Sequence, residues 1–207
     1  MKIHHCFILI FLLASCTNSK KKNQYAILKQ RIEEGLDKEQ EIRKMINNKK
    51  EFDNELNSKM GEIDSTNYLN VLKYLDEYGY PTISSNGKKL CDGVFYILQH
   101  NDLMTMEKYI GQLKKRAFEG EASKKHYAMM QDRILEHNNQ KQIYGTQVAP
   151  RRNSSGYLTN EYYVWPIQNV EIVDSLRKEM GFTQSIKEYA EALDAEYNRN
   201  EQLPKKQ

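Results

Sequence analysis

Apolar residues recur in steps of three and four along most of the chain, a spacing that predicts amphipathic helices. From Tyr25 to Met60 the apolar stripe is thin, and the other positions are dense in Lys, Glu, Gln and Asn. This pattern predicts one long helix, or two helices with a break near Gly35 or at Asn47 and Asn48. A thin stripe buries little surface, so we expect these helices to be peripheral. The stripe consists of Ile27, Leu28, Ile32, Leu36, Ile42, Met45, Ile46, Phe52 and Leu56.

Four more helices are predicted between positions 65 and 138. Ser65 and Thr66 are suited to cap the first of them, which Gly79 ends, and turn residues predict a loop over 79–87. The second, from Leu90 to His100, is apolar around most of its circumference, which predicts a central buried helix. The other two helices are predicted over 101–120, where Asn101 and Asp102 supply the cap, and over 122–138.

The pattern changes near position 142. Segments 142–148 and 157–167 are rich in β-branched and aromatic residues, and the turn-forming segment 150–156 separates them. Helical spacing returns over 169–180 and 184–197, which Gly181 separates. The predicted fold is therefore mainly α, a helical domain with a small two-stranded antiparallel β-hairpin.

The N-terminus has the layout of a lipoprotein signal peptide. A basic Lys2 and a short apolar core precede Leu13-Ala14-Ser15-Cys16, and the core is too short for a permanent transmembrane helix. This tetrapeptide resembles the lipobox of bacterial lipoproteins, whose cysteine carries the acyl anchor and becomes the first mature residue. The alternatives are an ordinary cleaved signal with an incidental cysteine, or a short uncleaved anchor.

These observations divide the chain into five parts and assign it to the bacterial cell envelope. The parts are a signal peptide (1–15), a flexible lipidated tether (16–24), a peripheral helical segment (25–62), a helical domain with the β-hairpin (63–200) and a disordered tail (201–207). The net charge is +3, and three lysines at 20–22 stand beside the anchor. We interpret that run as a solvated tether near anionic lipid headgroups, so the expected partner is a membrane and not nucleic acid.

Several kinds of site are excluded by inspection. The chain has no G-x-S-x-G, H-E-x-x-H or C-x-x-C motif, and Gly87-Lys88 lacks the remaining residues of a phosphate-binding loop. Cys91 has no partner in the mature form, so we expect a small buried residue and no disulfide. His126 and His137 lie roughly 16 Å apart along one predicted helix, so they cannot share a metal ion. We predict no metal site and identify no cofactor.

Three elements remain as candidates for chemistry. His100 and Asp102 stand at a helix junction, where they could converge, either through a hydrogen bond that orients the imidazole or as part of a metal site. The alternative is that Asp102 caps the next helix and His100 bonds a local carbonyl. Asp132 and Arg133 flank an apolar stripe on opposite sides, which favours structural roles for both. The stretch from Tyr144 to Gln147 holds a glycine inside a predicted strand, which indicates either a ligand-facing edge or close packing.

Four motifs in order resemble an uncharacterised bacterial family, the domain of unknown function numbered 6624. They are Gly79-Tyr80-Pro81, Gln99-His100-Asn101-Asp102, Asp132-Arg133 and Gln142-Ile143-Tyr144-Gly145-Thr146-Gln147. Asn101 stands where the family usually has alanine. The resemblance covers roughly residues 65–189 and supplies no activity, but it implies one polar pocket. That pocket would be formed by Gln99, His100, Asp102, Asp132, Arg133, Tyr144 and Gln147.

Three functions agree with this sequence. The first is a membrane-anchored envelope domain that binds an unknown small molecule or protein, with the hairpin and the His100 junction lining the site. The second is a hydrolase in which His100 is the general base, Asp102 orients it and Arg133 holds an anionic group. The third is a structural or immunity-type lipoprotein whose surface binds another protein. A ligand site requires a concave pocket at His100, whereas a protein-binding surface requires an exposed apolar patch.

Overall fold

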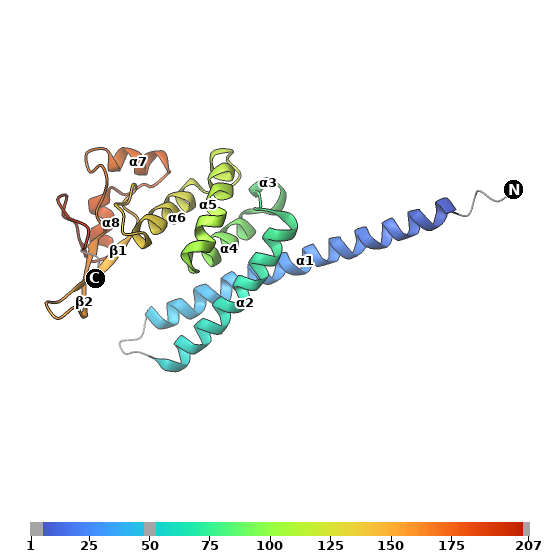
Figure 1. Cartoon of the computed structure of the whole chain (residues 1–207), viewed down its shortest axis with the longest axis horizontal. Coiled ribbons are helices and arrows are strands. Elements are labelled where there is room, and N and C mark those ends of the chain that lie inside the picture. The colour runs from blue at the N-terminus through green and yellow to red at the C-terminus, as the bar shows by residue number, and fades with distance from the viewer. Residues whose placement is uncertain (1–5, 48–52, 205–207) are drawn as a thin grey trace. The chain divides into compact units, whose positions relative to one another are not determined.

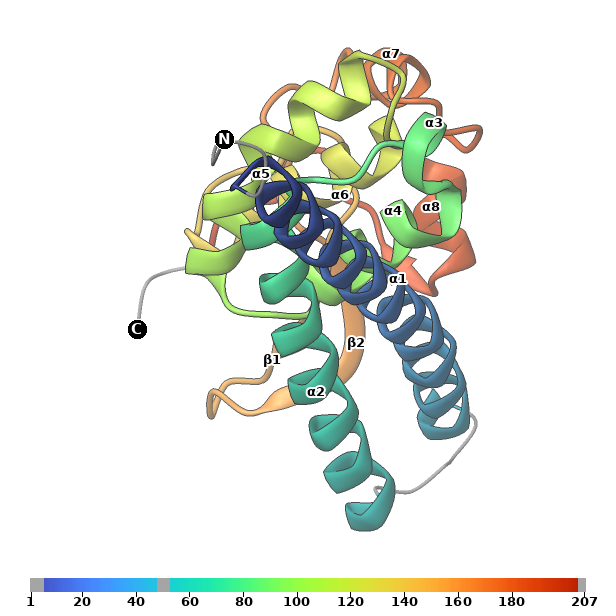
Figure 2. The same ribbon diagram turned by 90° about the vertical axis from the view of Figure 1, so that its right-hand side faces the viewer.

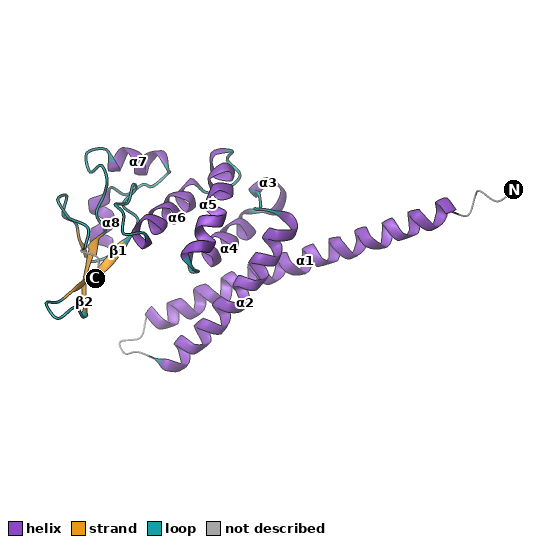
Figure 3. Ribbon diagram, viewed as in Figure 1, coloured by secondary structure: helices purple, strands orange, loops and turns teal. Residues whose placement is uncertain are grey.

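A computed structural model describes residues 6–47 and 53–204 of the chain. The fold is mainly helical with one small sheet, as the hydrophobic pattern predicts (Figure 3). The described chain divides into two compact units, and each has its own core. Among the described residues, the N-terminal unit comprises 6–47, 53–81 and 86–100, and the C-terminal unit comprises 82–85 and 101–204.

Three helices build the N-terminal unit: α1 (Cys6–Asn47), α2 (Asn54–Tyr78) and α4 (Lys88–Gln99). α1 and α2 lie side by side (Figures 1 and 2), and α4 packs against both. The break between α1 and α2 follows Asn47, one of the two predicted positions. α2 begins when Asp53 accepts a hydrogen bond from the amide of Leu56, and it ends at Gly79.

The apolar stripe of α1 is buried and not peripheral, which corrects the expectation from its width. Leu28, Ile32 and Ile42 are at most 3% exposed. A narrow stripe suffices here because α2 and α4 both pack against this helix. On α4, Leu90, Val94, Phe95 and Leu98 are fully buried, so the prediction of a buried helix from Leu90 onward is confirmed. The remaining core side chains of this unit include Val71, Tyr74, Leu75 and Cys91.

Two further predictions for this unit differ from the structure. α2 runs without interruption through Ser65, whose hydroxyl donates to the carbonyl of Gly61 one turn earlier, so no helix begins there. Segment 17–24, predicted as a flexible tether, continues α1, and its carbonyl at Lys21 accepts from the hydroxyl of Tyr78. Lysine, glutamine and asparagine without apolar periodicity indicate exposure, but they do not prevent a helix.

The C-terminal unit begins with two helices that pack together, α5 (Leu103–Phe118) and α6 (Lys124–His137). Asp102 caps α5 as predicted, and Ser123 caps α6. The predicted loop at 79–87 contains the short helix α3 (Ile83–Asn86). The amide of Ile83 donates to the carbonyl of Glu121 at 2.9 Å, which ties this segment to the turn between α5 and α6.

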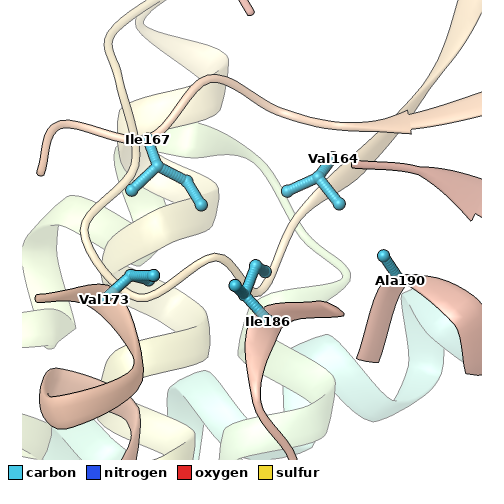
Figure 4. Packing of buried hydrophobic residues seen from close by; sticks show 5 residues of the cluster. All are labelled: Val164, Ile167, Val173, Ile186 and Ala190. Atoms are coloured by element: carbon cyan, nitrogen blue, oxygen red, sulfur yellow. The ribbon is translucent and has the colours of Figure 1, made fainter. Parts of the chain in front are cut away.

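The sheet has three strands, not two. β1 (Val148–Arg152) and β2 (Leu158–Val164) form the predicted antiparallel hairpin, and the two-residue β3 (Ala195–Glu196) pairs in parallel with β2. Segment 142–147, predicted as strand, is an irregular loop that joins α6 to β1. The helices α7 (Val173–Glu179) and α8 (Ile186–Ala192) complete the unit, and a cluster of apolar side chains joins them to the sheet (Figure 4). The cluster is formed by Val164, Ile167, Val173, Ile186 and Ala190.

The two ends of the chain are described only in part. Residues 1–5 of the predicted signal peptide and residues 205–207 of the predicted tail lie outside the described residues. The earlier part of that tail contacts the C-terminal unit, where Glu201 pairs with Arg151 at 3.0 Å. Within the described ranges, no helix combines the length and the apolar character that crossing a membrane requires.

Candidate functional site

His100, the strongest sequence candidate, is paired with a buried carboxylate of α1. Its Nδ1 contacts Oε1 of Glu39, a residue only 1% exposed, and its own side chain is 22% exposed. The last turn of α4 fixes the backbone of His100, since its amide donates to the carbonyl of Tyr96 at 3.3 Å. Asp102, the predicted orienting carboxylate, belongs to the other unit. Within the N-terminal unit, the carboxylate that holds the imidazole is Glu39, which the sequence reasoning missed.

Glu39 is ionised because His100 and Arg43 both donate hydrogen bonds to it. Burial by itself raises the pKa of this carboxyl, but the hydrogen bonds and charges of His100 and Arg43 lower it more, and the net pKa lies below the ordinary value. Arg43 donates from Nε to Glu39 and from Nη2 to Asp64, both at 2.9 Å. Burial raises the pKa of Asp64, whereas Arg43 opposes that shift. An anionic Glu39 accepts a hydrogen bond, so the proton of a neutral His100 resides on Nδ1.

This tautomer leaves the second ring nitrogen of His100 with a lone pair. Within the described part of the chain, Nδ1 and the backbone amide account for the hydrogen bonds of His100, and Nε2 makes none. Oε2 of Glu39 is buried and also lacks a described partner. A partly exposed imidazole whose inner nitrogen is held by a buried carboxylate can accept a proton or a hydrogen bond at its outer nitrogen.

The other half of the sequence-predicted site lies in the C-terminal unit, around Asp132. This fully buried carboxylate accepts hydrogen bonds from the backbone amides of the loop that follows α6: Oδ1 from Ile143 at 2.8 Å and Oδ2 from Thr146 at 3.0 Å. The amide of Tyr144 and the hydroxyl of Thr146 add two more donors, at 3.1 and 3.0 Å. Burial raises the pKa of Asp132 to about 6, although these hydrogen bonds oppose the shift.

The carbonyl groups of the same loop face a buried cation. Arg177 is 1% exposed, and its Nη1 donates to the carbonyls of Tyr144 and Gly145 at 3.0 and 3.2 Å. Its guanidinium also stacks on Phe182 and Tyr189, with 4.9 Å to each ring centroid. Burial lowers the pKa of Arg177, and the charge of Asp132 is among the influences that oppose this. The loop is thus held between an anion that binds its amides and a cation that binds its carbonyls.

Two glutamines complete this loop. The side chain of Gln142 accepts from the amide of Gln147 at 2.8 Å and donates to the carbonyls of Gln147 and Trp165. The side chain of Gln147 donates to the hydroxyl of Thr146 at 3.0 Å and to the carbonyl of Met129 at 3.4 Å. Both residues are buried. Their side-chain amides bond backbone N–H and C=O groups that a regular strand would otherwise pair with a neighbouring strand.

The remaining candidates have identifiable positions. Asp102 accepts from the amide and the hydroxyl of Thr105, both at 2.9 Å, so it caps α5. Gln99 is buried on α4, and Arg133 is half-buried on α6. The ring of Tyr144 packs edge-on against Tyr127, and burial raises its pKa to about 12. The structure therefore brings Asp132, Tyr144 and Gln147 together in one unit and places Gln99 and His100 in the other.

No metal centre is evident among the candidates. Across residues 6–47 and 53–204, no group of three or more His, Cys, Asp or Glu side chains is placed to hold a metal ion. A cavity of about 600 Å³ in the C-terminal unit is lined by Arg151, Tyr163 and Trp165 among others, and by none of the predicted site residues. The cavities described in the N-terminal unit also lack those residues, so the concave pocket expected at His100 is not among them.

Two of the missed residues carry a detectable signal. Glu39 stands three residues after Leu36 and three before Ile42, and so on the apolar stripe of α1. Arg177 likewise stands between Val173 and Met180 on a helical face. A charged residue at a core-facing position must find a partner, so each of them marks a buried polar contact.

Comparison with known proteins gives one match. The model of a family described as "Family of unknown function (DUF6624)" matches residues 26–201 of the chain. No curated protein and no solved structure matches.

Proposed function

We propose that this chain, which belongs to the family of unknown function DUF6624, is a membrane-anchored lipoprotein of the bacterial cell envelope that binds a ligand at His100. The anchor is the acylated Cys16, at the end of the lipobox-like segment. The observation that carries the binding proposal is the pairing of Nδ1 of His100 with the buried Glu39, which leaves Nε2 as an acceptor on a partly exposed ring.

The contrast between the two groups of candidates supports this choice. In the C-terminal unit, both carboxylate oxygens of Asp132 accept hydrogen bonds from one loop, and that loop also satisfies Gln142 and Gln147. Support of the fold is enough to explain such a network, because buried polar groups must be paired and here they pair with one another. His100 differs because its outer nitrogen has no structural partner in the described residues. We therefore assign Asp132, Tyr144 and Gln147 to the support of the fold and His100 to ligand contact.

Protection from chemical modification tests the binding site. Diethylpyrocarbonate acylates an imidazole nitrogen that carries an accessible lone pair, and peptide mass spectrometry identifies the modified histidine. We expect His100 to react in the native full chain and to be protected by the low-molecular-weight fraction of an envelope extract. His137, 42% exposed, is the internal control and should react equally with and without the extract. If the extract leaves the reactivity of His100 unchanged, the proposed binding site is wrong.

Hydrolysis is the second candidate function, and the Glu39–His100 pair specifically favours it. A buried anion behind the imidazole stabilises the imidazolium that forms when Nε2 takes a proton from water or from a hydroxyl group. The full chain should then release p-nitrophenol from p-nitrophenyl acetate, and His100→Asn should lower kcat by about a hundredfold or more. Glu39→Gln should lower kcat while it leaves KM nearly unchanged. Equal rates in all three proteins would leave binding as the function.

The anchor has its own test. Mass spectrometry of the mature protein should find a diacylated Cys16 at the N-terminus, because two acyl chains hold a protein stably on a membrane. Cys16→Ala should leave the precursor unprocessed at this position. An unmodified Cys16 in the mature protein would contradict the lipoprotein proposal and would leave the His100 site unaffected.

A further inference from the structure

A small cavity between α1 and α2 has a charge pattern unlike that of the other cavities of the N-terminal unit. It measures about 240 Å³, and its lining includes three basic side chains and no acidic one. Lys20 and Arg31 come from α1 and Lys73 comes from α2. Farther along the same two helices, a cavity of about 390 Å³ is lined by Lys38 and Lys59 together with Glu41 and Glu62, so its charges balance.

The three cations of the small cavity have no partner in the part of the chain that the structure describes. Lys20, Arg31 and Lys73 are exposed and form no ion pair there. Exposed lysines elsewhere on these helices, such as Lys38 and Lys59, also form no ion pair in the described residues, but acidic side chains share their cavity. Like charges that line one small cavity repel one another unless an anion joins them. The cavity is therefore suited to a negatively charged group.

The remaining lining residues indicate what kind of anion fits. Asn23 and Gln24 supply polar side chains, and Gln24 also donates to Glu77 of α2. Ile27, which is 41% exposed, and Leu28 supply apolar surface. Cations, amides and apolar groups in one cavity match a phosphate that carries hydrocarbon chains, as in a phospholipid, better than they match a small inorganic ion.

The position of the cavity along the chain identifies the membrane as the source. Lys20 follows Cys16 by four residues, about 6 Å along a helix. Tyr25, which follows the lining residue Gln24, is half-buried and packs edge-on against the half-buried Tyr78, with ring centroids 5.3 Å apart. Tyrosine is enriched at membrane interfaces because its ring is apolar and its hydroxyl is polar. We propose that this cavity binds the phosphate of an anionic phospholipid in the membrane that the Cys16 anchor enters.

Such a contact gives the anchored protein an orientation. The lipid-binding proposal depends on the proposed anchor only to bring the cavity to a membrane, since Cys16 does not line the cavity. An acyl chain alone permits free rotation of the attached domain, whereas a headgroup held between α1 and α2 fixes both helices relative to the membrane surface. The N-terminal unit would then present His100 in a defined direction.

Vesicle binding by the mature chain tests this site. The protein begins at position 16, as the mature lipoprotein would, and carries Cys16→Ser, so neither the apolar signal segment nor an acyl anchor dominates binding. Its affinity is compared between phosphatidylcholine vesicles and vesicles that also contain phosphatidylglycerol. The test variant combines Lys20→Gln, Arg31→Gln and Lys73→Gln. The matched control combines Lys38→Gln, Lys44→Gln and Lys59→Gln, which removes the same charge from exposed positions of the same two helices.

The expected result is a selective loss of the preference for phosphatidylglycerol. A basic residue near an anionic membrane contributes about fivefold in affinity, so the test variant should lose roughly a hundredfold and the control less than about fivefold. Equal losses in both variants would mean diffuse attraction without a site, and no loss in the test variant would mean that the cavity is not used. Either result overturns the proposal.

Inorganic phosphate distinguishes the lipid from a soluble anion. If phosphate alone binds the mature chain by calorimetry, if the test variant abolishes that binding and if the vesicle preference is unchanged, the cavity takes a soluble phosphate and the lipid proposal is wrong. Because every protein in this comparison lacks the acyl anchor, these outcomes do not depend on whether Cys16 is acylated in the cell.

Discussion

Removal of the Asp132 carboxylate is expected to destabilise the C-terminal unit strongly. In Asp132→Ala, the amides of Ile143, Tyr144 and Thr146 lose their acceptor, although Ile143 is half-buried and the other two residues are buried. A buried donor without a partner costs about 1 to 3 kcal/mol, so three such donors give a loss of about 3 to 9 kcal/mol. Since a domain is typically stable by only about 5 to 15 kcal/mol, this loss is a large fraction of the total.

Asp132→Asn provides a graded comparison. The remaining amide oxygen can still accept from Ile143 and Tyr144, but the new NH₂ group faces the amide of Thr146. One stranded donor costs about 1 to 3 kcal/mol, less than in the alanine variant. Glu136→Ala is the control, because it removes a half-buried carboxylate from the same helix and should change stability by about 0.5 kcal/mol or less.

Urea unfolding of the full chain measures these changes. Trp165 is the single tryptophan and belongs to the C-terminal unit, where its indole donates to the carbonyl of Gln140, so its fluorescence reports on that unit. The fluorescence transition should shift in the order alanine, asparagine, control. A loss below about 1 kcal/mol in Asp132→Ala would refute the structural role, and it would return Asp132 to the list of ligand-binding candidates.

Three further predictions concern pH, packing and backbone conformation. Burial raises the pKa of Asp132 to about 6 from 3.8, so between these pH values the folded chain holds a proton that the unfolded chain has released. Protonation of Asp132 therefore adds to the free energy of unfolding at low pH, and this addition is lost as the pH rises through about 6. Urea melts should therefore show a wild-type advantage over Asp132→Asn that is about 1 to 2 kcal/mol larger near pH 5 than near pH 7.5, and a pH-independent difference would contradict this. Phe95→Ala should cost about 3 to 5 kcal/mol by circular dichroism melts, because the ring is fully buried in α4, and a loss below about 1 kcal/mol would place α4 at the surface. Gly145→Ala should lower the free energy of unfolding by about 2 to 4 kcal/mol, since Gly145 has φ +69° and a Cβ there would lie 2.5 Å from Cδ1 of Ile186. Urea unfolding followed by tryptophan fluorescence measures this loss, and an unchanged midpoint of unfolding would show that the loop adjusts freely.

The hydrophobic pattern determined most of the helices, because a helix is specified by residues three and four apart. The burial of α4, the cap at Asp102 and the end of α2 at Gly79 all follow from side chains within one or two turns. The burial of Cys91 follows from its apolar neighbours in the same way. The family motifs also marked the residues that meet in the loop after α6.

Only the tertiary structure decided what those polar residues contact. Glu39 and His100 are 61 positions apart, and no periodicity indicates that a glutamate of α1 holds the imidazole at the end of α4. Segment 142–147 has the composition of a strand, but Asp132 and Arg177 bind its amides and carbonyls and keep it irregular. The spacing of apolar residues indicates which side of a helix or strand is buried. The partner of a buried charge depends on which elements pack together, and that packing exists only when the whole core has formed.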